Sequence, residues 1–351
     1  VDLTIVTLDR NEKKLDSIVK PSCRKIQINL APESKYIKLG IRFAGEGSCK
    51  LKSILVGKID LDNGCFLNKS DVLLITDNYP DYDDLYKYAF VHSRVKEHKN
   101  KGKIVDVFRL SEKYQKGYSE FENINITTGY YEAVTNAIIN GQYETILLHF
   151  LSESIWDGIK NIVKGKKIIV WVHGAEAQSW ERRKYNYTSD EEIRAAKQLS
   201  EKKMTFWKEI MDLAKGKEDY HFHFVFVSKY LAECVFEDVG IRLPEDMFSI
   251  IHNYIDEKNF SYSPKSPEMR KKILSIRPFA DRTYANDLTV SAILELSRER
   301  SFKEFEFRII GQGRLFKTTV KPLRKFKNVI IEEKFLRQSE IAELHKQYGI
   351  F

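Results

Sequence analysis

The chain has 351 residues, of which 42% are hydrophobic and 12% aromatic, so large cores are possible and the composition argues against wholesale disorder. The net charge is +8, but basic and acidic residues alternate, and no long Lys/Arg block marks a nucleic-acid groove. We therefore expect two or three folded domains and no nucleic-acid partner.

The cysteines and the apolar runs bear on the cellular compartment. Cys23, Cys49, Cys65 and Cys234 are scattered and form no CxxC pair, which favours reduced thiols over a disulfide framework or a zinc site. No apolar run approaches the ~20 residues of a membrane span, and no signal peptide is evident. The predicted location is the cytoplasm, and peripheral contact with the inner membrane face stays open.

Residues 1–68 are predicted to form a small all-β sandwich. Turn signals separate the strand-like segments and no helical period occurs. The expected strands are Leu3–Leu8, Lys25–Leu30, Tyr36–Phe43 and Cys49–Ile59. Their rhythm resembles that of jelly-roll modules that bind carbohydrate, whereas a module that only packs or oligomerises is an equal alternative.

Residues 69–256 alternate strands with helices, which predicts a parallel sheet covered on both faces. The expected strands are Val72–Ile75, Ile104–Phe108, Thr145–Phe150, Lys167–Val172 and Phe222–Val227, and the segment Ser249–Asn253 closes the domain. Helices are expected over Leu85–Lys99, 130–140, 155–163 and Asp190–Ala214, and after Ser228, which is placed as a helix cap. This stretch is predicted to be a Rossmann-like domain.

A polar linker, Tyr254–Pro267, precedes a second α/β unit at residues 268–351. Its expected strands are Ile273–Ile276, Phe305–Ile310 and Val329–Ile331. Two such units leave a cleft between them, and ligands in parallel sheets bind at the carboxyl ends of the strands. The chain starts without methionine and stops where an apolar strand begins, so we expect a piece of a longer polypeptide whose second Rossmann-like domain is incomplete.

Two loops of the second unit have the residue types of an anion site. Arg277 and Arg282 lie between a strand and a helix N-terminus, and arginine suits bidentate phosphate contacts. Gly311 and Gly313 follow the next strand, where glycine permits close approach to a nucleotide. Two surface arginines and a plain tight turn are the alternatives. GxGxxG and a convincing YxxxK pair are absent, which argues against a dehydrogenase or epimerase.

The first unit offers a candidate catalytic residue, His173, which ends a buried strand and has Glu176 beside it. A histidine there can hydrogen bond to a sugar hydroxyl or a developing charge, whereas bonding to the loop backbone is the structural alternative. No GxSxG elbow supports a hydrolase. The DxD triplets at 60–62 and 81–83 are expected by chance, and His221 and His223 lack a third ligand, so no metal is predicted.

Several segments together resemble a known enzyme family. They are VWVHGAE (170–176), FVFVSKYLAE (224–233), IIHNYID (250–256), KILSIRPFADRTYANDLTV (272–290) and FRIIGQG (307–313). In this order they resemble a retaining glycosyltransferase of the GT-B fold, closest to the family 4 type ("glycosyl transferases group 1") of bacterial capsule, cell-wall and surface polysaccharide clusters. The resemblance covers residues from about 70 to 351.

The resemblance implies that a nucleotide-diphosphate sugar binds in the interdomain cleft, with no metal or other cofactor. Its residues match the phosphate-binding arginine (Arg277), with Arg282 in place of a usual lysine, the glycine turn (Gly311 and Gly313) and the histidine facing the donor sugar (His173). Further candidates for the acceptor side or the cleft are Tyr79, Asp81, Glu176, Arg182, Ser228 and Asn253.

Two departures from the family pattern bear on function. The usual Gly-Gly loop is replaced by Asn78–Asp81, and the paired glutamates of the family, ExxxxxxxE, would lie beyond Phe351. The predicted function is transfer of a sugar, with retention, to a glycan or lipid-linked acceptor in bacterial surface polysaccharide synthesis. The alternative is a non-catalytic carbohydrate-binding or scaffold protein with a degenerate or incomplete GT-B domain.

Overall fold

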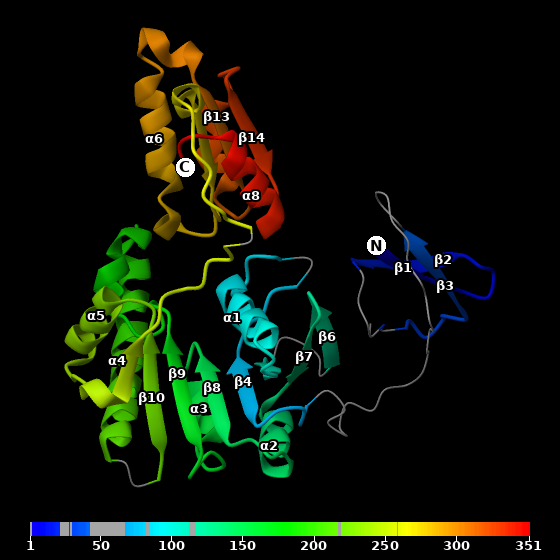
Figure 1. Ribbon diagram of the computed structural model, residues 1–351, viewed down its shortest axis with the longest axis vertical. Helices are drawn as coiled ribbons and strands as arrows, with labels where there is room; N and C mark the ends of the chain where they lie inside the picture. Colours follow the sequence, from blue (N-terminus) through cyan, green and yellow to red (C-terminus); the bar gives the residue numbers. More distant parts are fainter. Residues whose placement is uncertain are drawn as a thin grey trace.

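The computed structural model describes residues 2–21, 28, 30–42, 67–81, 84–111, 117–216, 219–257 and 259–351. Within them the strands form three sheets, of three, eight and three strands (Figure 1). The two larger stretches of α/β structure, around the eight-stranded sheet and around the second three-stranded sheet, are called the first unit and the second unit below.

The N-terminal sheet is small and antiparallel. It contains β1 (Asp2–Leu8), β2 (Lys14–Pro21) and β3 (Tyr36–Arg42) in the order β2-β1-β3. Strands were predicted at β1 and β3 but not at β2, whose alternation is interrupted by polar residues on both faces. The other two predicted strands and Cys23, Cys49 and Cys65 fall largely or wholly outside the described residues, which contain one three-stranded sheet in this part of the chain.

The eight-stranded sheet of the first unit has the order β11-β10-β9-β8-β4-β5-β7-β6, and β6 alone runs antiparallel, against β7. Its strands are β4 (Val72–Thr76), β5 (Asp106–Leu110), β6 (Gly117–Phe121), β7 (Ile124–Gly129), β8 (Thr145–His149), β9 (Lys167–Val172), β10 (His221–Phe226) and β11 (Phe248–Ile250). The β6–β7 hairpin was not predicted. Glu122 and Asn123 form its two-residue turn with positive φ angles of 44° and 66°, as the right-handed twist of a hairpin requires.

Helices cover both faces of this sheet, as the βαβ pattern predicted. Leu74 and Val107 pack with α1 on one face, whereas Leu73 and Ile75, one residue along, pack with α2 to α5 on the other. The helices are α1 (Ala89–Asn100), α2 (Tyr131–Asn140), α3 (Glu153–Ile159), α4 (Asp190–Gly216) and α5 (Lys229–Val239), with the short 3₁₀ helix η2 (Trp180–Asn186). Ser228 caps α5 by accepting the Leu231 amide at 3.1 Å, as predicted.

The second unit contains a parallel sheet in the order β12-β13-β14. Its elements are β12 (Lys272–Ile276), the 3₁₀ helix η5 (Arg282–Tyr284), α6 (Asn286–Leu296), β13 (Glu306–Gly311), α7 (Phe316–Val320), β14 (Val329–Glu333) and α8 (Gln338–Gln347). Ile350 forms a parallel bridge with Ile273, and its carbonyl accepts the Leu274 amide at 2.9 Å. Residue 350 therefore continues the sheet at the free edge of β12.

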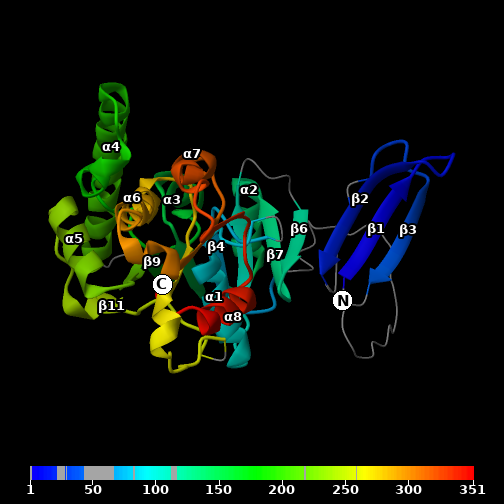
Figure 2. The ribbon, with the colours of Figure 1, turned by 90° about the horizontal axis from the view of Figure 1, so that it is seen from above.

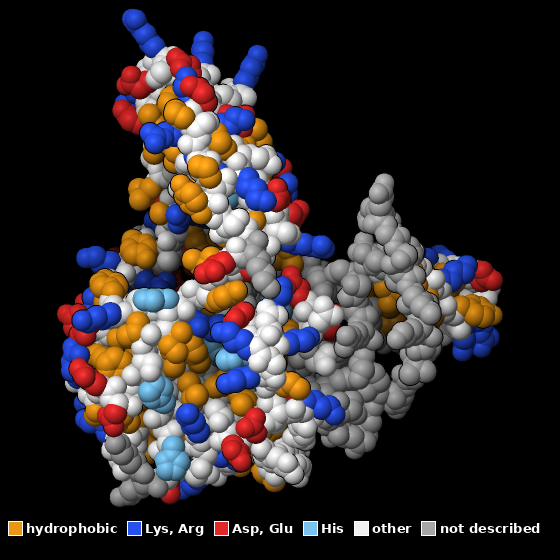
Figure 3. All heavy atoms as spheres, in the orientation of Figure 1, with side chains coloured by type: hydrophobic (Ala, Val, Ile, Leu, Met, Phe, Trp, Pro, Cys, Tyr) orange, Lys and Arg blue, Asp and Glu red, His pale blue; other side chains and the backbone are white. Residues whose placement is uncertain are grey.

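The arrangement of the units places the strand ends of the first beneath the second. In Figure 1 the arrowheads of β4, β8, β9 and β10 point toward the second unit. The N-terminal sheet lies on the β6 side of the large sheet in both ribbon views (Figure 2). On the face in Figure 3, Lys and Arg side chains are interspersed with Asp and Glu. In the described part of the chain, no helix combines the length and apolarity that a membrane crossing requires.

Candidate functional site

Three loops of the first unit meet at the carboxyl ends of neighbouring strands. Asp77 follows β4, Phe150 follows β8 and His173 follows β9, and these strands lie side by side in the order β9-β8-β4. The start of α1 adds Tyr88 and Phe90 to the same edge. Because the carboxyl edge of a parallel sheet is where ligands bind, this is the first candidate surface of a cleft.

Four rings form what we call the aromatic cluster: Tyr88, Phe90, Phe150 and His173. Tyr88 stacks on Phe150 with ring centroids 3.8 Å apart, and Phe150 stacks on His173 at 4.6 Å. Tyr88 and Phe150 have positive φ angles of 46° and 59°, which are unusual for aromatic residues and mark strained backbone. Because all four side chains are only partly buried, the cluster offers ring surface to a ligand.

His173 is held by a second histidine. Its Nε2 lies 2.9 Å from Nδ1 of His149, and its own Nδ1 is buried without a hydrogen-bond partner among the described residues. Burial, followed by the charge of Arg94, lowers the pKa of His173 to about 3. The imidazole is therefore neutral at physiological pH and can offer a hydrogen bond at Nδ1, but it does not act as a cation.

The turn after His173 depends on Gly174 and Glu176. The Glu176 carboxylate accepts the backbone amide of His173, and burial raises the pKa of this carboxyl group. Gly174 has φ +146°, and a Cβ there would lie 3.2 Å from Nη2 of Arg183. The sequence His-Gly-Ala-Glu thus forms a compact turn that brings the Arg183 guanidinium against the loop bearing His173.

Arg94, from α1, was not predicted as a site residue. Its guanidinium carbon lies 3.8 Å from the centroid of the Trp171 ring. Its Nη2 donates to Asn253 Oδ1 at 2.9 Å and to the His252 carbonyl at 3.2 Å. Asn253 was predicted near the cleft, and the structure shows that its side chain ties the start of the interdomain linker to the first unit.

The arginine loop of the second unit lies between β12 and α6, as predicted. Arg277 and Arg282 are both exposed, and Nη1 of Arg277 is 3.5 Å from the Tyr284 carbonyl. Asn286, the first residue of α6, donates to the Pro278 carbonyl at 2.7 Å and so fixes the loop on the helix N-terminus. The Arg277 guanidinium therefore lies beside the segment that leads into the N-terminus of α6, whereas the charge of the exposed Arg282 acts on Glu192 of α4.

The two predicted glycines contact this loop. A Cβ at Gly311 would lie 2.0 Å from the Arg277 carbonyl oxygen, and one at Gly313, where φ is +145°, would lie 2.5 Å from the Phe279 carbonyl carbon. Side chains at either position would collide with backbone. In this structure the glycines are therefore needed because the turn after β13 packs directly against the arginine loop.

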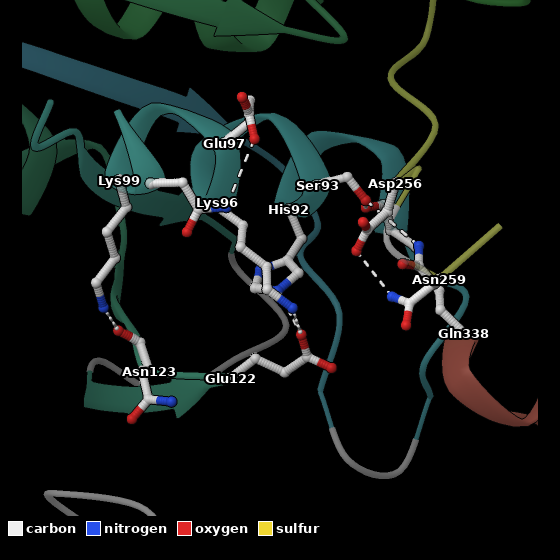
Figure 4. A network of polar contacts seen from close by, with 12 residues as sticks. His92, Ser93, Lys96, Glu97, Lys99, Glu122, Asn123, Asp256, Asn259 and Gln338 are labelled. Carbon is white, nitrogen blue, oxygen red and sulfur yellow. Dashed lines mark hydrogen bonds and ion pairs between the residues drawn. The ribbon is translucent and has the colours of Figure 1, made fainter. Parts of the chain in front are cut away.

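Direct bonds connect the two units at this edge. Asn186 Nδ2 in η2 donates to Thr283 Oγ1 in η5 at 3.0 Å, and the Leu336 amide donates to Tyr86 Oη at 3.1 Å. Gln338 of α8 reaches Ser93 of α1, as Figure 4 shows, at 3.4 Å. These contacts hold the second unit over the carboxyl edge of the first sheet.

Adjacent arginines of η2 have different environments. Arg182 pairs with Asp238, with Nη2 2.9 Å from Oδ1, and also with Glu237, so it is bound to α5. Arg183 lies by Gly174, its charge also acts on Tyr284 of the second unit, and its buried Nε has no partner among the described residues. Arg182 was the predicted cleft residue, but the structure places Arg183 between the two units.

Two predicted acceptor residues are engaged elsewhere. Tyr79 is completely buried, and its hydroxyl lies 3.0 Å from Nδ1 of His92, whose Nε2 lies 3.3 Å from Glu122 (Figure 4). The Asp81 carboxylate accepts the Asp84 amide at 2.8 Å. Tyr79 therefore locks the loop after β4 from inside and has no ring surface for a sugar, whereas Tyr88 at the end of that loop does.

Among the described residues, a cavity lies at the opposite edge of this sheet, and no metal cluster is found. A cavity of about 750 Å³ lies at the amino ends of β8, β9 and β10, where Lys167, His221 and His223 line it, at the opposite edge of the sheet. Over the described ranges, no group of three or more His, Cys, Asp or Glu side chains is arranged to hold a metal. The triplet at 60–62 and residues 82 and 83 of the second triplet lie outside those ranges.

Comparison with known proteins identifies the fold. No protein-family model and no curated sequence matches the chain. Sucrose-phosphate synthase from Thermosynechococcus elongatus superposes with a TM-score of 0.52 at 12% identity, over 79% of this chain and 73% of that one. The two α/β units have the GT-B fold. The N-terminal antiparallel sheet is an addition to it, as predicted.

Two more distant solved structures are also similar. A glycosyltransferase from Rickettsia africae has a TM-score of 0.48 at 14% identity, over 80% of this chain and 72% of that one. UDP-GlcNAc 2-epimerase from Neisseria meningitidis, bound to UDP-GlcNAc, has a TM-score of 0.38 at 14% identity, over 79% and 75% of the two chains. The activity therefore has to be argued from the residues themselves.

Proposed function

We propose that the protein is a glycosyltransferase that uses a nucleotide-diphosphate sugar, of the family 4 type, with residues 69–256 as acceptor domain and 268–351 as donor domain. The observation that carries the proposal is that, in a GT-B fold, the arginine loop of one unit and the loop bearing His173 of the other belong to units that are bonded to each other. The exposed arginine loop at the N-terminus of α6 lies in the unit held over the edge that bears His173.

Each side chain has a role in the proposed reaction. Arg277, Arg282 and Arg183, with the N-terminus of α6, neutralise the departing diphosphate without a metal. Nδ1 of His173 bonds a hydroxyl of the donor sugar. The C1–O bond to phosphate breaks as the acceptor oxygen bonds to C1 from the same face, and the acceptor proton passes to the phosphate oxygen.

The aromatic cluster supplies the acceptor side in this proposal. Ring faces stack on the apolar faces of sugars. Phe90 and Phe150 lie beside His173, Tyr88 stacks on Phe150, and all three have part of their surface exposed. A glycan or lipid-linked saccharide stacked there would present its hydroxyl next to the donor sugar. We place this activity in the synthesis of bacterial surface polysaccharide.

A thermal-shift panel tests the donor site. UDP-, GDP-, ADP- and dTDP-sugars are added to the protein, and the one that binds at 100 times its Kd should add about 2.7 kcal/mol to stability. No shift with any of them overturns the donor assignment and favours a non-catalytic carbohydrate-binding or scaffold protein.

Arg277→Ala tests the phosphate contact. Loss of one preorganised charge should cost roughly 2–4 kcal/mol of transition-state stabilisation, which lowers kcat/KM by about 30- to 1000-fold. Arg270→Ala is the matched control, because Arg270 is also exposed but precedes the amino end of β12, at the other edge of the sheet. Equal effects of the two changes contradict the assignment.

A further inference from the structure

The buried partner of His173 is the feature of the site that the proposed reaction leaves unused. His149 is the last residue of β8, with 1% of its surface exposed. Its ring lies nearly parallel to that of Trp171, with centroids 5.6 Å apart and an angle of 7°, and meets that of His173 edge to edge, with centroids 5.1 Å apart and an angle of 20°. These two neighbours fix the plane of the His149 imidazole, and its Nδ1 lies 2.9 Å from Nε2 of His173.

The pair of rings has only one proton to share at this contact. Burial lowers the pKa of both imidazoles, and the Arg94 guanidinium on Trp171 disfavours a further positive charge nearby. A hydrogen bond between two neutral imidazoles needs an N–H on one nitrogen and a lone pair on the other. The hydrogen bond therefore couples the tautomers of the two rings: if His149 donates, His173 has its proton on Nδ1, and if His149 accepts, His173 has its proton on Nε2 and a lone pair on Nδ1.

We propose that His149 is a positioning residue that fixes the tautomer and ring orientation of His173, so that Nδ1 of His173 is the nitrogen that meets the substrate. The proposal rests on the proposed function in that a donor sugar supplies the partner. Nδ1 is buried and unbonded among the described residues, and unpaired buried nitrogens are rare. A sugar hydroxyl that reached Nδ1 would complete the hydrogen bonding of the pair.

Two variants separate the hydrogen bond from the packing. His149→Phe keeps a ring of similar shape between Trp171 and His173 but cannot bond to Nε2. His149→Asn removes the ring, but its amide group can occupy the position of Nδ1 and restores a hydrogen-bond partner for Nε2 of His173. If His149 only fills space, the Phe variant should behave like the wild type. If the hydrogen bond from His149 fixes the tautomer of His173, the Asn variant should behave like the wild type and the Phe variant should not.

The first readout is spectroscopic and needs no substrate. Histidine labelled with ¹⁵N reports each tautomer through long-range ¹H–¹⁵N correlations, and the His173 signals are assigned by their loss in His173→Gln. We expect one tautomer of His173 in the wild type and in His149→Asn, and a mixture in His149→Phe. A mixture in the wild type, or one unchanged tautomer in His149→Phe, overturns the proposal.

The second readout is binding of the nucleotide sugar that stabilises the wild type in the thermal-shift panel, compared with its nucleoside diphosphate alone. Because His173 is assigned to the sugar, His149→Phe should weaken binding of the nucleotide sugar by roughly tenfold and leave the affinity for the nucleoside diphosphate unchanged. Equal weakening of both refutes the positioning role. If no nucleotide sugar binds the wild type, the proposed function fails, and the spectroscopic result still decides the role of His149.

Discussion

Replacing Arg94 by methionine tests whether one buried cation holds the interdomain linker on the first unit. Arg94 is 8% exposed and makes three contacts: the face of Trp171, the Asn253 side chain and the His252 carbonyl. Methionine retains much of the apolar stem but removes the charge and both donors. The two oxygens at the start of the linker are then left without this donor.

The expected loss follows from these contacts. A cation over a tryptophan ring contributes ~0.5–2 kcal/mol, and each hydrogen bond from a charged donor ~1.5–3 kcal/mol. Burial of the charged guanidinium costs free energy, and it lowers the pKa of Arg94 to about 10. Removing the charge recovers this desolvation cost, which amounts to several kcal/mol, and so offsets part of the loss. We therefore expect Arg94→Met to lower the free energy of unfolding by about 2–4 kcal/mol.

Urea unfolding followed by tryptophan fluorescence measures this loss, because all four tryptophans lie in the first unit: Trp156, Trp171, Trp180 and Trp207. Arg242→Met is the matched control. Arg242 also pairs with a side chain, Glu233, and lies 5.1 Å from the Phe236 ring, but it is exposed. Exposed pairs contribute ~0–1 kcal/mol. If the two variants lose the same stability, burial of Arg94 does not strengthen its contacts.

Three further predictions concern a glycine, a carboxylate and adjacent arginines. Gly311→Ala should lower stability by ~1–3 kcal/mol or more and weaken nucleotide-sugar binding, because its Cβ would overlap backbone. Hydrogen bonds from His92 and Lys96 lower the pKa of Glu122 to about 2, so the ionised carboxylate stabilises the fold. Glu122→Gln should therefore be less stable than the wild type, by the full difference above about pH 4.5 and by less as the pH falls and the wild-type carboxylate becomes protonated. Arg183→Met should weaken binding of the nucleotide sugar, whereas Arg182→Met should lower stability.

The outcomes that contradict these predictions are specific. Wild-type stability and binding in Gly311→Ala would mean that the turn after β13 separates from the arginine loop. Urea titrations measure the difference in free energy of unfolding between the wild type and Glu122→Gln. If this difference grew below pH 4.5, the Glu122 carboxylate would not be stabilised in its ionised form by the fold. Equal losses of binding in the two arginine variants, measured by thermal shift, would remove the distinction between Arg183 and Arg182.

The sequence predicted the parts of the fold that depend on local order. Strand–helix alternation gave both parallel sheets, and the positions of His173 and Arg277 after apolar strands placed them at carboxyl edges. The cap at Ser228 is likewise a local property of residues 228–231. The β6–β7 hairpin was missed because Glu122-Asn123 lacks the glycine that marks such turns.

What the sequence did not reveal depends on residues far apart in the chain. His149 and His173 meet only because β8 and β9 are neighbours, and strand order cannot be read from periodicity. Arg94 reaches Asn253 across 159 positions. The choice between Arg182 and Arg183 depends on the acids of α5, which hold one guanidinium and leave the other beside Gly174.

The close approach of the turn after β13 to the arginine loop has a consequence for how a donor would bind. Because Gly311 and Gly313 leave no space between the two loops, and Asn286 secures the arginine loop to α6, these segments form one stiff block. A diphosphate would meet cationic groups on a loop already held in position, so little ordering within the second unit would oppose binding. Conformational adjustment would fall instead on the linker and on the few bonds between the units.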